Sequence, residues 1–358
     1  MLLGIFGRIL YAHIIFSIYV LLTYFYTMAI KRKHLWKKIR RGIKYPILLF
    51  FIRCFILTIR LLPRNFVLRV FRRLGLLAFR VVKGERLKTI KNIKFAYGDT
   101  LIDEQVTTMA RNVFAHQALN FADYLHTLGY RTRKDFSKLI DFVGEENLKV
   151  EYEKGKGVLC LVSHTGSWEF SAIMPPVMGY ETTAVSKALA NKKINDLIIG
   201  YREKRGMKNI SRGKAYPLLI EALAKGECMI IMIDQDTLVK GTYVDFFGKK
   251  AFTPIGAARL ALDSGSPVVP MFMKRLPNNR HQFTIYPALE TIRTGNDDHD
   301  LVENTKLYTQ VIENIIRETP DQWVWMHERW KTTPEIEKAH LEKLRLKKER
   351  EKAAKGNN

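Results

Sequence analysis

His164 and Glu169 follow an apolar run in the sequence and carry side chains suited to acid–base chemistry. The run Val158–Ser163 is typical of a buried strand, and the letters TGS after His164 predict a turn into a helix. An imidazole at such a strand end can take the proton of an attacking hydroxyl, while a carboxylate holds its tautomer. We therefore interpret His164 and Glu169 as a general-base pair. The alternative is a helix cap whose histidine only satisfies a backbone group.

Further polar blocks follow along the chain. Arg202 and Arg205 end an amphipathic helical pattern, where basic residues are also favoured by the helix dipole. Asp234 and Asp236, separated by one glutamine, end an apolar strand pattern. Two such acids also suit the metal-binding DxD of a glycosyltransferase acting on a membrane glycolipid, although that interpretation leaves the histidine block unexplained. A non-enzymatic membrane scaffold is a second alternative.

Taken in order, these blocks resemble the lysophospholipid acyltransferase superfamily, and within it the late acyltransferases of lipid A biosynthesis. The resemblance is carried by HTGSWE, by DQD with FFG and TPIG after it, by GSPVVP and by WMHERWK. It covers residues 46–331. A bare histidine and glutamate at this spacing is a weak signal, but four blocks in the family's order are a strong one.

The resemblance implies transfer of a fatty acyl chain from an acyl carrier protein thioester to a hydroxyl of a lipid A precursor or related membrane glycolipid. Coenzyme A as the donor stays open. The hydroxyl would attack directly, without a covalent enzyme intermediate, and no cofactor or metal is implied. His164 and Glu169 would be catalytic. The residues expected to bind substrate are Arg202, Lys187, Arg205 and Asp236. Asp234 and Asp236 of the DQD block are both expected at the edge of the site or in its architecture.

Two positions depart from the family pattern. Lys187 stands where an arginine is frequent, which keeps a positive charge but loses bidentate geometry. Glu328 stands where an arginine is common in the last block, which weakens any functional claim about that block.

Positive charge is concentrated at the amino-terminal end. Residues 1–94 contain 21 Lys and Arg against one acid, out of a formal net charge of +24 for all 358 residues. These basic residues lie among Ile, Leu, Val and Phe, a combination typical of proteins that bind an anionic membrane surface. Nucleic acid, the other partner of basic proteins, does not fit so apolar a segment.

An uncharged run, Ile9–Ile30, is long enough to cross a bilayer and is followed at once by a cluster of Lys and Arg. The positive-inside rule then predicts a bacterial inner-membrane protein with its catalytic domain on the cytoplasmic face. A second apolar run, Pro46–Leu62, contains Arg53 and Arg60, and we interpret it as an interfacial helix rather than a second span.

From about residue 139, short apolar strands alternate with amphipathic helices. This pattern predicts an α/β fold with a mainly parallel sheet flanked by helices. A long helix is expected over Leu101–Leu128, ahead of the sheet. The predicted organisation is a transmembrane anchor at 1–30, a basic membrane-docking region at 31–98, a catalytic domain at 99–333 and a charged tail at 334–358.

Overall fold

The computed structural model describes residue 47 and residues 50–186, 192–211 and 215–356. The chain forms two compact units, Met1–Leu61 and Leu62–Asn358. In the first unit, residues 50–61 are helical. None of the helices in the described part of the chain combines the length and the apolar character needed to span a membrane. The predicted span, Ile9–Ile30, lies outside the described residues.

The second unit is built on a seven-stranded sheet of order β1-β9-β8-β2-β5-β3-β4. Strands β2, β3, β4, β5 and β8 run parallel, whereas β9 is antiparallel to β8 and parallel to β1. A separate antiparallel hairpin consists of β6 and β7. The strand bounds are β1 Ile140–Val143, β2 Val158–Val162, β3 Thr182–Ser186, β4 Met207–Ser211, β5 Cys228–Met232, β6 Gly241–Phe246, β7 Lys249–Pro254, β8 Val268–Arg275 and β9 His281–Ile285.

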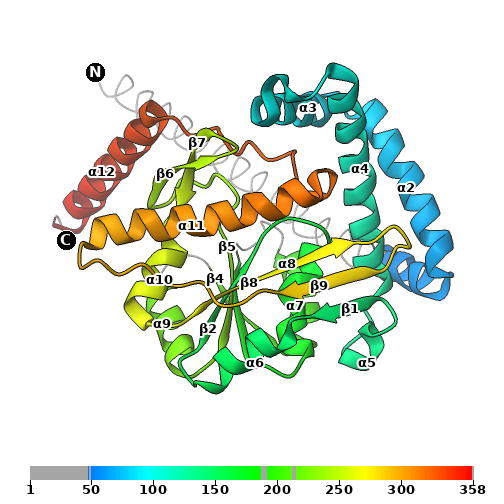
Figure 1. The fold of residues 1–358 in the computed structure, drawn as a ribbon, viewed down its shortest axis with the longest axis horizontal. Helices are drawn as coiled ribbons and strands as arrows, with labels where there is room; N and C mark the ends of the chain where they lie inside the picture. The colour runs from blue at the N-terminus through cyan, green and yellow to red at the C-terminus, as the bar shows by residue number, and fades with distance from the viewer. Residues whose placement is uncertain (1–46, 48–49, 187–191, 212–214, 357–358) are drawn as a thin grey trace, which may run out of the picture. The chain divides into compact units, whose positions relative to one another are not determined.

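Helices precede, connect and follow these strands (Figure 1). Their bounds are α2 Arg64–Val81, α3 Lys83–Tyr97, α4 Asp103–His126, α5 Arg133–Phe136, α6 Glu145–Glu153, α7 Trp168–Val177, α8 Lys192–Glu203, α9 Tyr216–Ala224, α10 Gly256–Ser264, α11 Asp297–Glu318 and α12 Pro334–Gly356. Short 3₁₀ turns lie at Gly98–Thr100 and Pro320–Gln322.

Each face of the sheet has its own apolar core, because alternate residues of a strand point to opposite faces. Leu159 and Leu161 of β2 pack with residues of α9, α10 and α11, and with α3 and α4. Cys160 and Val162 pack with residues of α5, α6 and α7. A strand that is apolar on both faces, as β2 is, is typical of a parallel sheet covered on both sides.

The α/β fold with a mainly parallel sheet is confirmed, as is the long helix, which runs as α4 over Asp103–His126. Strands β1 and β4 were not expected; both are short and partly exposed, so they lack an apolar run. Hairpin β6–β7 was not predicted either, because its glycines and aromatic residues also suit turns and packing. The predicted domain boundaries stay predictions, and α2 and α3 belong to the same compact unit as the sheet.

A buried carboxylate fastens α2 to the sheet. Asp123 of α4 accepts hydrogen bonds from Arg64 of α2 at 2.7 Å and 3.0 Å, and from His281 of β9 at 2.9 Å. Arg275 of β8 lies 2.7 Å from the same carboxylate. Burial alone would raise the pKa of Asp123, but these partners hold it well below its usual range. Four elements therefore meet at one ionised group.

Replacing Asp123 by alanine should strongly destabilise the fold. Arg275 and His281 would stay buried without their carboxylate, and losing one partner of a buried ion pair costs about 3–5 kcal/mol. The free energy of unfolding, measured by urea denaturation, should fall by that amount. Asp141→Ala is the matched control, because Asp141 pairs with Arg280 at the surface. A loss at Asp123 no larger than at Asp141 would contradict this account.

Candidate active site

The register of two neighbouring strands brings His164 beside Asp234. Strands β2 and β5 are parallel, and Val162 of β2 pairs with Met232 of β5. His164 and Asp234 each stand two residues beyond that pair, at the carboxyl end of the sheet. Their side chains meet there: His164 Nδ1 lies 2.8 Å from Asp234 Oδ1. Backbone pairing in the sheet thus positions both groups.

Asp234 is fully engaged by hydrogen-bond donors. Besides the imidazole, it accepts the backbone N–H of His164 at 2.7 Å and the indole N–H of Trp323 at 2.9 Å. Burial alone would raise the pKa of Asp234, but His164 and these donors lower it to about 2. The carboxylate is therefore ionised at neutral pH and accepts from Nδ1–H. This fixes the His164 tautomer that leaves a lone pair on Nε2.

His164 is placed to act as a base. Burial by itself lowers the pKa of His164, but Asp234, and after it Glu169, raise the pKa above its ordinary value. An imidazole with an ionised carboxylate on Nδ1 and a lone pair on Nε2 can take a proton from an attacking hydroxyl and return it to a leaving group.

The turn after His164 is held from several sides. Gly166 has a φ of +56°, and a Cβ at this position would lie 1.8 Å from the carbonyl oxygen of Met273. The side chain of Asn120 on α4 donates to the Gly166 carbonyl and accepts from the Ser167 hydroxyl. At position 166 only glycine can adopt the positive φ and leave room for the carbonyl oxygen of Met273. Helix α7 begins directly afterwards, which places Glu169 in its first turn.

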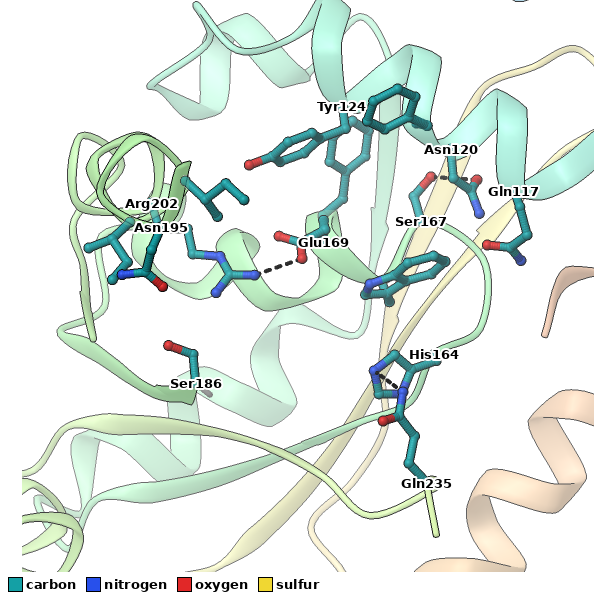
Figure 2. Close-up of a pocket in the computed structure, with 15 residues that line it drawn as sticks. Gln117, Asn120, Tyr124, His164, Ser167, Glu169, Ser186, Asn195, Arg202 and Gln235 are labelled. Atoms are coloured by element: carbon teal, nitrogen blue, oxygen red, sulfur yellow. Dashed lines mark hydrogen bonds and ion pairs between the residues drawn. The ribbon is translucent and has the colours of Figure 1, made fainter. Parts of the chain in front are cut away.

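Glu169 is paired with Arg202 rather than with His164. Arg202 Nη2 of α8 donates to Glu169 Oε1 at 2.7 Å, and Figure 2 shows the two side chains directed toward each other. The carboxylate that orients the imidazole is that of Asp234. The contact with His164 that the sequence analysis expected of Glu169 is thus made by Asp234, and the catalytic roles of His164 and Glu169 stay predictions. Glu169 still lines the same cavity and raises the pKa of His164.

The other residues expected to bind substrate lie in different surroundings. Arg205 is buried, and it donates to the backbone carbonyls of Thr127 and Tyr130. Asp236 accepts from the backbone N–H and the hydroxyl of Thr332, both at 2.6 Å, which ties the carboxyl-terminal segment to the sheet. Lys187 lies outside the described residues. Among the described members of the predicted set, Arg202 is the one that lines the cavities beside His164.

Three side chains beside His164 were not predicted as catalytic or substrate-binding residues: Asp234, Gln235 and His327. Gln235 Nε2 lies 2.9 Å from His164 Nε2 and 2.8 Å from His327 Nε2 (Figure 2 shows the first contact). The backbone carbonyl of His327 accepts from Asn92 of α3. A signal for Asp234 and Gln235 was present in the polar DQD at a strand end. His327, far along the chain, could be found only through the resemblance.

Two cavities meet at His164. The first, of about 620 Å³, lies among α4, α7 and α8; most of its lining residues are polar, and aromatic and aliphatic side chains of the same helices complete its wall. The second, of about 750 Å³, lies among strand ends, α9 and α10 and is mainly apolar. Both are within the usual size of ligand sites. The residues that line both cavities are His164, Trp168, Glu169, Ser186, Arg202 and Gln235.

Polar atoms at the first cavity lack partners within the described residues. They are Gln117 Nε2, the Tyr124 hydroxyl, Glu169 Oε2 and Arg202 Nε, all buried. Burial, and then the Glu169 charge, raise the pKa of Tyr124 to about 12, so its hydroxyl stays protonated. Together these atoms offer an acceptor and three donors to a polar ligand.

The chain matches a model of the bacterial lipid A biosynthesis acyltransferases over residues 36–332, most of its length. It belongs to this family. As a family member it is an acyltransferase, and the histidine at the meeting point of two cavities is consistent with that chemistry.

The chain is similar in sequence to acyltransferases from several bacteria. A lipid A biosynthesis acyltransferase of Haemophilus influenzae is 22% identical over 76% of this chain and 84% of its own length. The lipid A biosynthesis lauroyltransferase of Escherichia coli K12 is 23% identical over 76% and 88%. A phosphatidylinositol mannoside acyltransferase of Mycobacterium tuberculosis is 25% identical over 52% and 58%. The match to the mannoside enzyme thus spans little more than half of either chain.

The glycosyltransferase alternative does not agree with these findings. In this lipid A-family acyltransferase, Asp234 is occupied by His164 and Trp323, and Asp236 by Thr332. The two carboxylates of the DQD block are therefore engaged within the protein. In the described part of the chain, no group of three or more His, Cys, Asp or Glu is arranged to hold a metal ion.

Proposed function

We propose that this acyltransferase moves a fatty acyl chain from an acyl carrier protein thioester to a hydroxyl of a lipid A precursor or a closely related phosphorylated glycolipid. The observation that carries the proposal is the position of His164 where two cavities meet, one with mostly polar lining residues (the polar cavity) and one with mostly apolar lining residues (the apolar cavity). Such a position is what direct transfer between a headgroup hydroxyl and an acyl thioester requires.

In this proposal the apolar cavity takes the acyl chain. Its lining contains a run of apolar side chains from the carboxyl end of β5 and from α9 and α10. An alkyl chain gains free energy in proportion to the apolar surface it buries there. Apolar side chains of this wall include Met207, Leu219, Met229, Met232, Ile233 and Leu260.

The polar cavity takes the headgroup of the acceptor. Arg202 carries a planar guanidinium suited to a phosphate, and Glu169 holds it in place through one oxygen. Glu169 Oε2 and the Tyr124 hydroxyl are left to contact sugar hydroxyls. His164 takes the proton of the attacking hydroxyl, the tetrahedral oxyanion collapses, and the thiolate leaves with that proton. The histidine and its carboxylate act without a covalent enzyme intermediate.

A transfer assay with purified protein tests this function. Acyl carrier protein and coenzyme A thioesters of the same fatty acid would be offered with a lipid A precursor or with a phosphatidylinositol mannoside, and products identified by mass spectrometry. We expect a singly added acyl chain on the lipid A precursor, with the carrier protein as the better donor. No transfer from either thioester would overturn the proposal, and transfer to the mannoside alone would overturn the acceptor.

We also propose that the enzyme works at the cytoplasmic face of the inner membrane, with α2 against anionic lipid. The helix exposes apolar side chains and arginines together. Such a surface can insert apolar groups while its charges meet lipid phosphates. The exposed residues are Phe66, Leu74, Leu77 and Val81, with Arg69, Arg72, Arg73 and Arg80.

Reversing two of these charges should weaken membrane binding. Each basic side chain near an anionic surface contributes about 1 kcal/mol, so Arg72→Glu with Arg73→Glu should lower partitioning onto phosphatidylglycerol vesicles by about 25-fold or more at low salt. Vesicle co-sedimentation measures this, and the difference should shrink as salt rises. Lys338→Glu with Lys343→Glu, on the exposed tail helix, is the matched control. Equal losses in the two double variants would mean that α2 is not a specific membrane surface.

A further inference from the structure

Gln235 links two histidines through one amide nitrogen. Its Nε2 lies 2.9 Å from His164 Nε2 and 2.8 Å from His327 Nε2, and the two rings lie 5.7 Å apart between centroids. A primary amide nitrogen carries two hydrogens and no usable lone pair. Both contacts are therefore hydrogen bonds only if each imidazole presents a lone pair at Nε2. For His164 this is the tautomer that Asp234 selects.

The contact with Gln235 exists only while His164 is neutral. A hydrogen bond donated to the lone pair of a base stabilises the unprotonated form and so opposes protonation. Gln235 thus acts against Asp234, which favours the imidazolium. The charged groups around His164 are Asp234 after β5 and Glu169 of α7, which is paired with Arg202 of α8. Lys88 and Glu85 of α3 act on His327.

We propose that Gln235 is a further catalytic residue of the acyl transfer, and this inference rests on the proposed function. Before the acceptor binds, one amide N–H caps the lone pair of His164 and keeps the base free of a proton. When the acceptor hydroxyl takes that position, the released N–H donates to the thioester carbonyl oxygen as it becomes negatively charged. The same amide N–H thereby donates a hydrogen bond first to the base and then to the oxyanion.

The step balances with the groups named. The acceptor oxygen bonds to the thioester carbon, its proton passes to His164 Nε2, and the carbonyl oxygen takes the negative charge that Gln235 stabilises. The oxyanion then reforms the carbonyl, the carbon–sulfur bond breaks, and the proton on Nε2 passes to the thiolate. The attacking oxygen lies within hydrogen-bond distance of Nε2. The carbonyl oxygen beside it is then within reach of a donor that itself contacts Nε2.

His327 is a positioning residue for this amide. By accepting the second N–H, it keeps the nitrogen of Gln235, rather than its carbonyl oxygen, turned toward His164. Burial, and then the His164 charge, lower the pKa of His327, which keeps it an acceptor at neutral pH. Asn92 of α3 holds the segment by donating to the carbonyls of Trp325 and His327. Helix α3 thereby supports the amide through the backbone.

The test compares Gln235→Leu, which removes the donor, with Gln235→Glu, which replaces it by an acceptor. Gln282→Leu on β9, whose amide bonds only to Thr284 among the described residues, is the control for the exchange itself. The first measurement is an NMR titration of the His164 imidazole in the full-length protein without substrate. We expect a higher pKa for His164 in Gln235→Leu, a still higher one in Gln235→Glu, and no change in the control.

The second measurement is kcat and KM for transfer as a function of pH. Loss of one oxyanion donor should lower kcat by about 10²–10³-fold on the high-pH plateau, where His164 is neutral in every variant, with little change in KM. His327→Leu should lower the plateau kcat by roughly 10-fold, the contribution of one hydrogen bond. It should shift the pH profile in the same direction as Gln235→Leu does. His327→Asn, which retains an acceptor, should recover part of that loss.

The outcomes separate the two claims. An unchanged His164 pKa in Gln235→Leu overturns the capping of the base, whatever happens to the rate. A raised pKa with a plateau kcat within a few-fold of the wild type overturns the donation to the oxyanion. Absence of transfer by the wild type would count against the proposed function and with it against the oxyanion role. The titration needs no substrate and still decides whether Gln235 caps His164.

Discussion

Replacing His164 by alanine should lower kcat/KM for acyl transfer by about 10²–10⁴-fold, the usual contribution of a general base. Asp234→Asn should lose a comparable amount, up to about 10⁴-fold, although it preserves the size of the side chain. An amide at this position can donate to Nδ1 and so select the wrong imidazole tautomer. Both variants are to be compared with the wild type by initial rates, with circular dichroism to confirm that they fold.

The pH dependence supplies a second readout of the same pair. His164 acts as a base only when it is unprotonated, and its pKa is raised above the ordinary value by Asp234. The rate should therefore increase as the pH rises through a pKa higher than that of a free histidine. In Asp234→Asn the residual rate should begin to rise at lower pH. An unchanged pH profile in this variant would mean that Asp234 does not control the base.

The second large effect is expected at Glu169 and Arg202, where the structure and the sequence resemblance imply different roles. If Glu169 oriented His164, Glu169→Gln would behave like Asp234→Asn. The observed pairing with Arg202 predicts instead a rise in KM for the acceptor, with the pH profile moved to lower pH by less than in Asp234→Asn, because Glu169 raises the pKa of His164 less than Asp234 does. Breaking one partner of such a pair costs about 2–5 kcal/mol, so kcat/KM should fall by roughly 30-fold or more.

Arg202 variants complete that comparison. Arg202→Ala should match Glu169→Gln in its rise of KM, and Arg202→Lys should recover only part of the loss because lysine lacks the planar fork. Lys204→Ala, at an exposed position next to α8, is the control for charge alone. Equal losses at Arg202 and Lys204 would indicate a diffuse electrostatic field and would remove the basis for a specific headgroup contact.

The sequence predicted the structure well where the local residue pattern alone determines the secondary structure of a segment. Strand β2, the turn at Gly166 and helix α7 were predictable, since an apolar run, a small-residue turn and a second, mainly apolar segment follow one another. The order of the strands was not predictable. Strands β3 and β4 lie between β2 and β5 in the sequence, yet β2 and β5 are neighbours in the sheet.

That neighbour relation explains why the sequence pointed to Glu169, and not to Asp234, as the carboxylate in contact with the histidine. Glu169 lies five residues from His164, and local spacing made it the natural choice. Asp234 lies 70 residues away and becomes a partner only through the pairing of β2 with β5. Arg202 and Arg205 show the same limit: both end one helical pattern, and only packing distinguishes the arginine at the cavity from the one bound to backbone carbonyls.

The paired register of β2 and β5 has a consequence for how this enzyme can change over time. The distance between His164 and Asp234 depends on how many residues separate each of them from the paired positions of β2 and β5. It does not depend on the identity of the side chains around them. Substitutions in those strands can accumulate as long as they stay apolar. A single inserted or deleted residue would turn the histidine or the aspartate to the opposite face of the sheet. Changes of residue type are therefore tolerated in β2 and β5, whereas a change in the length of either strand would separate His164 from Asp234.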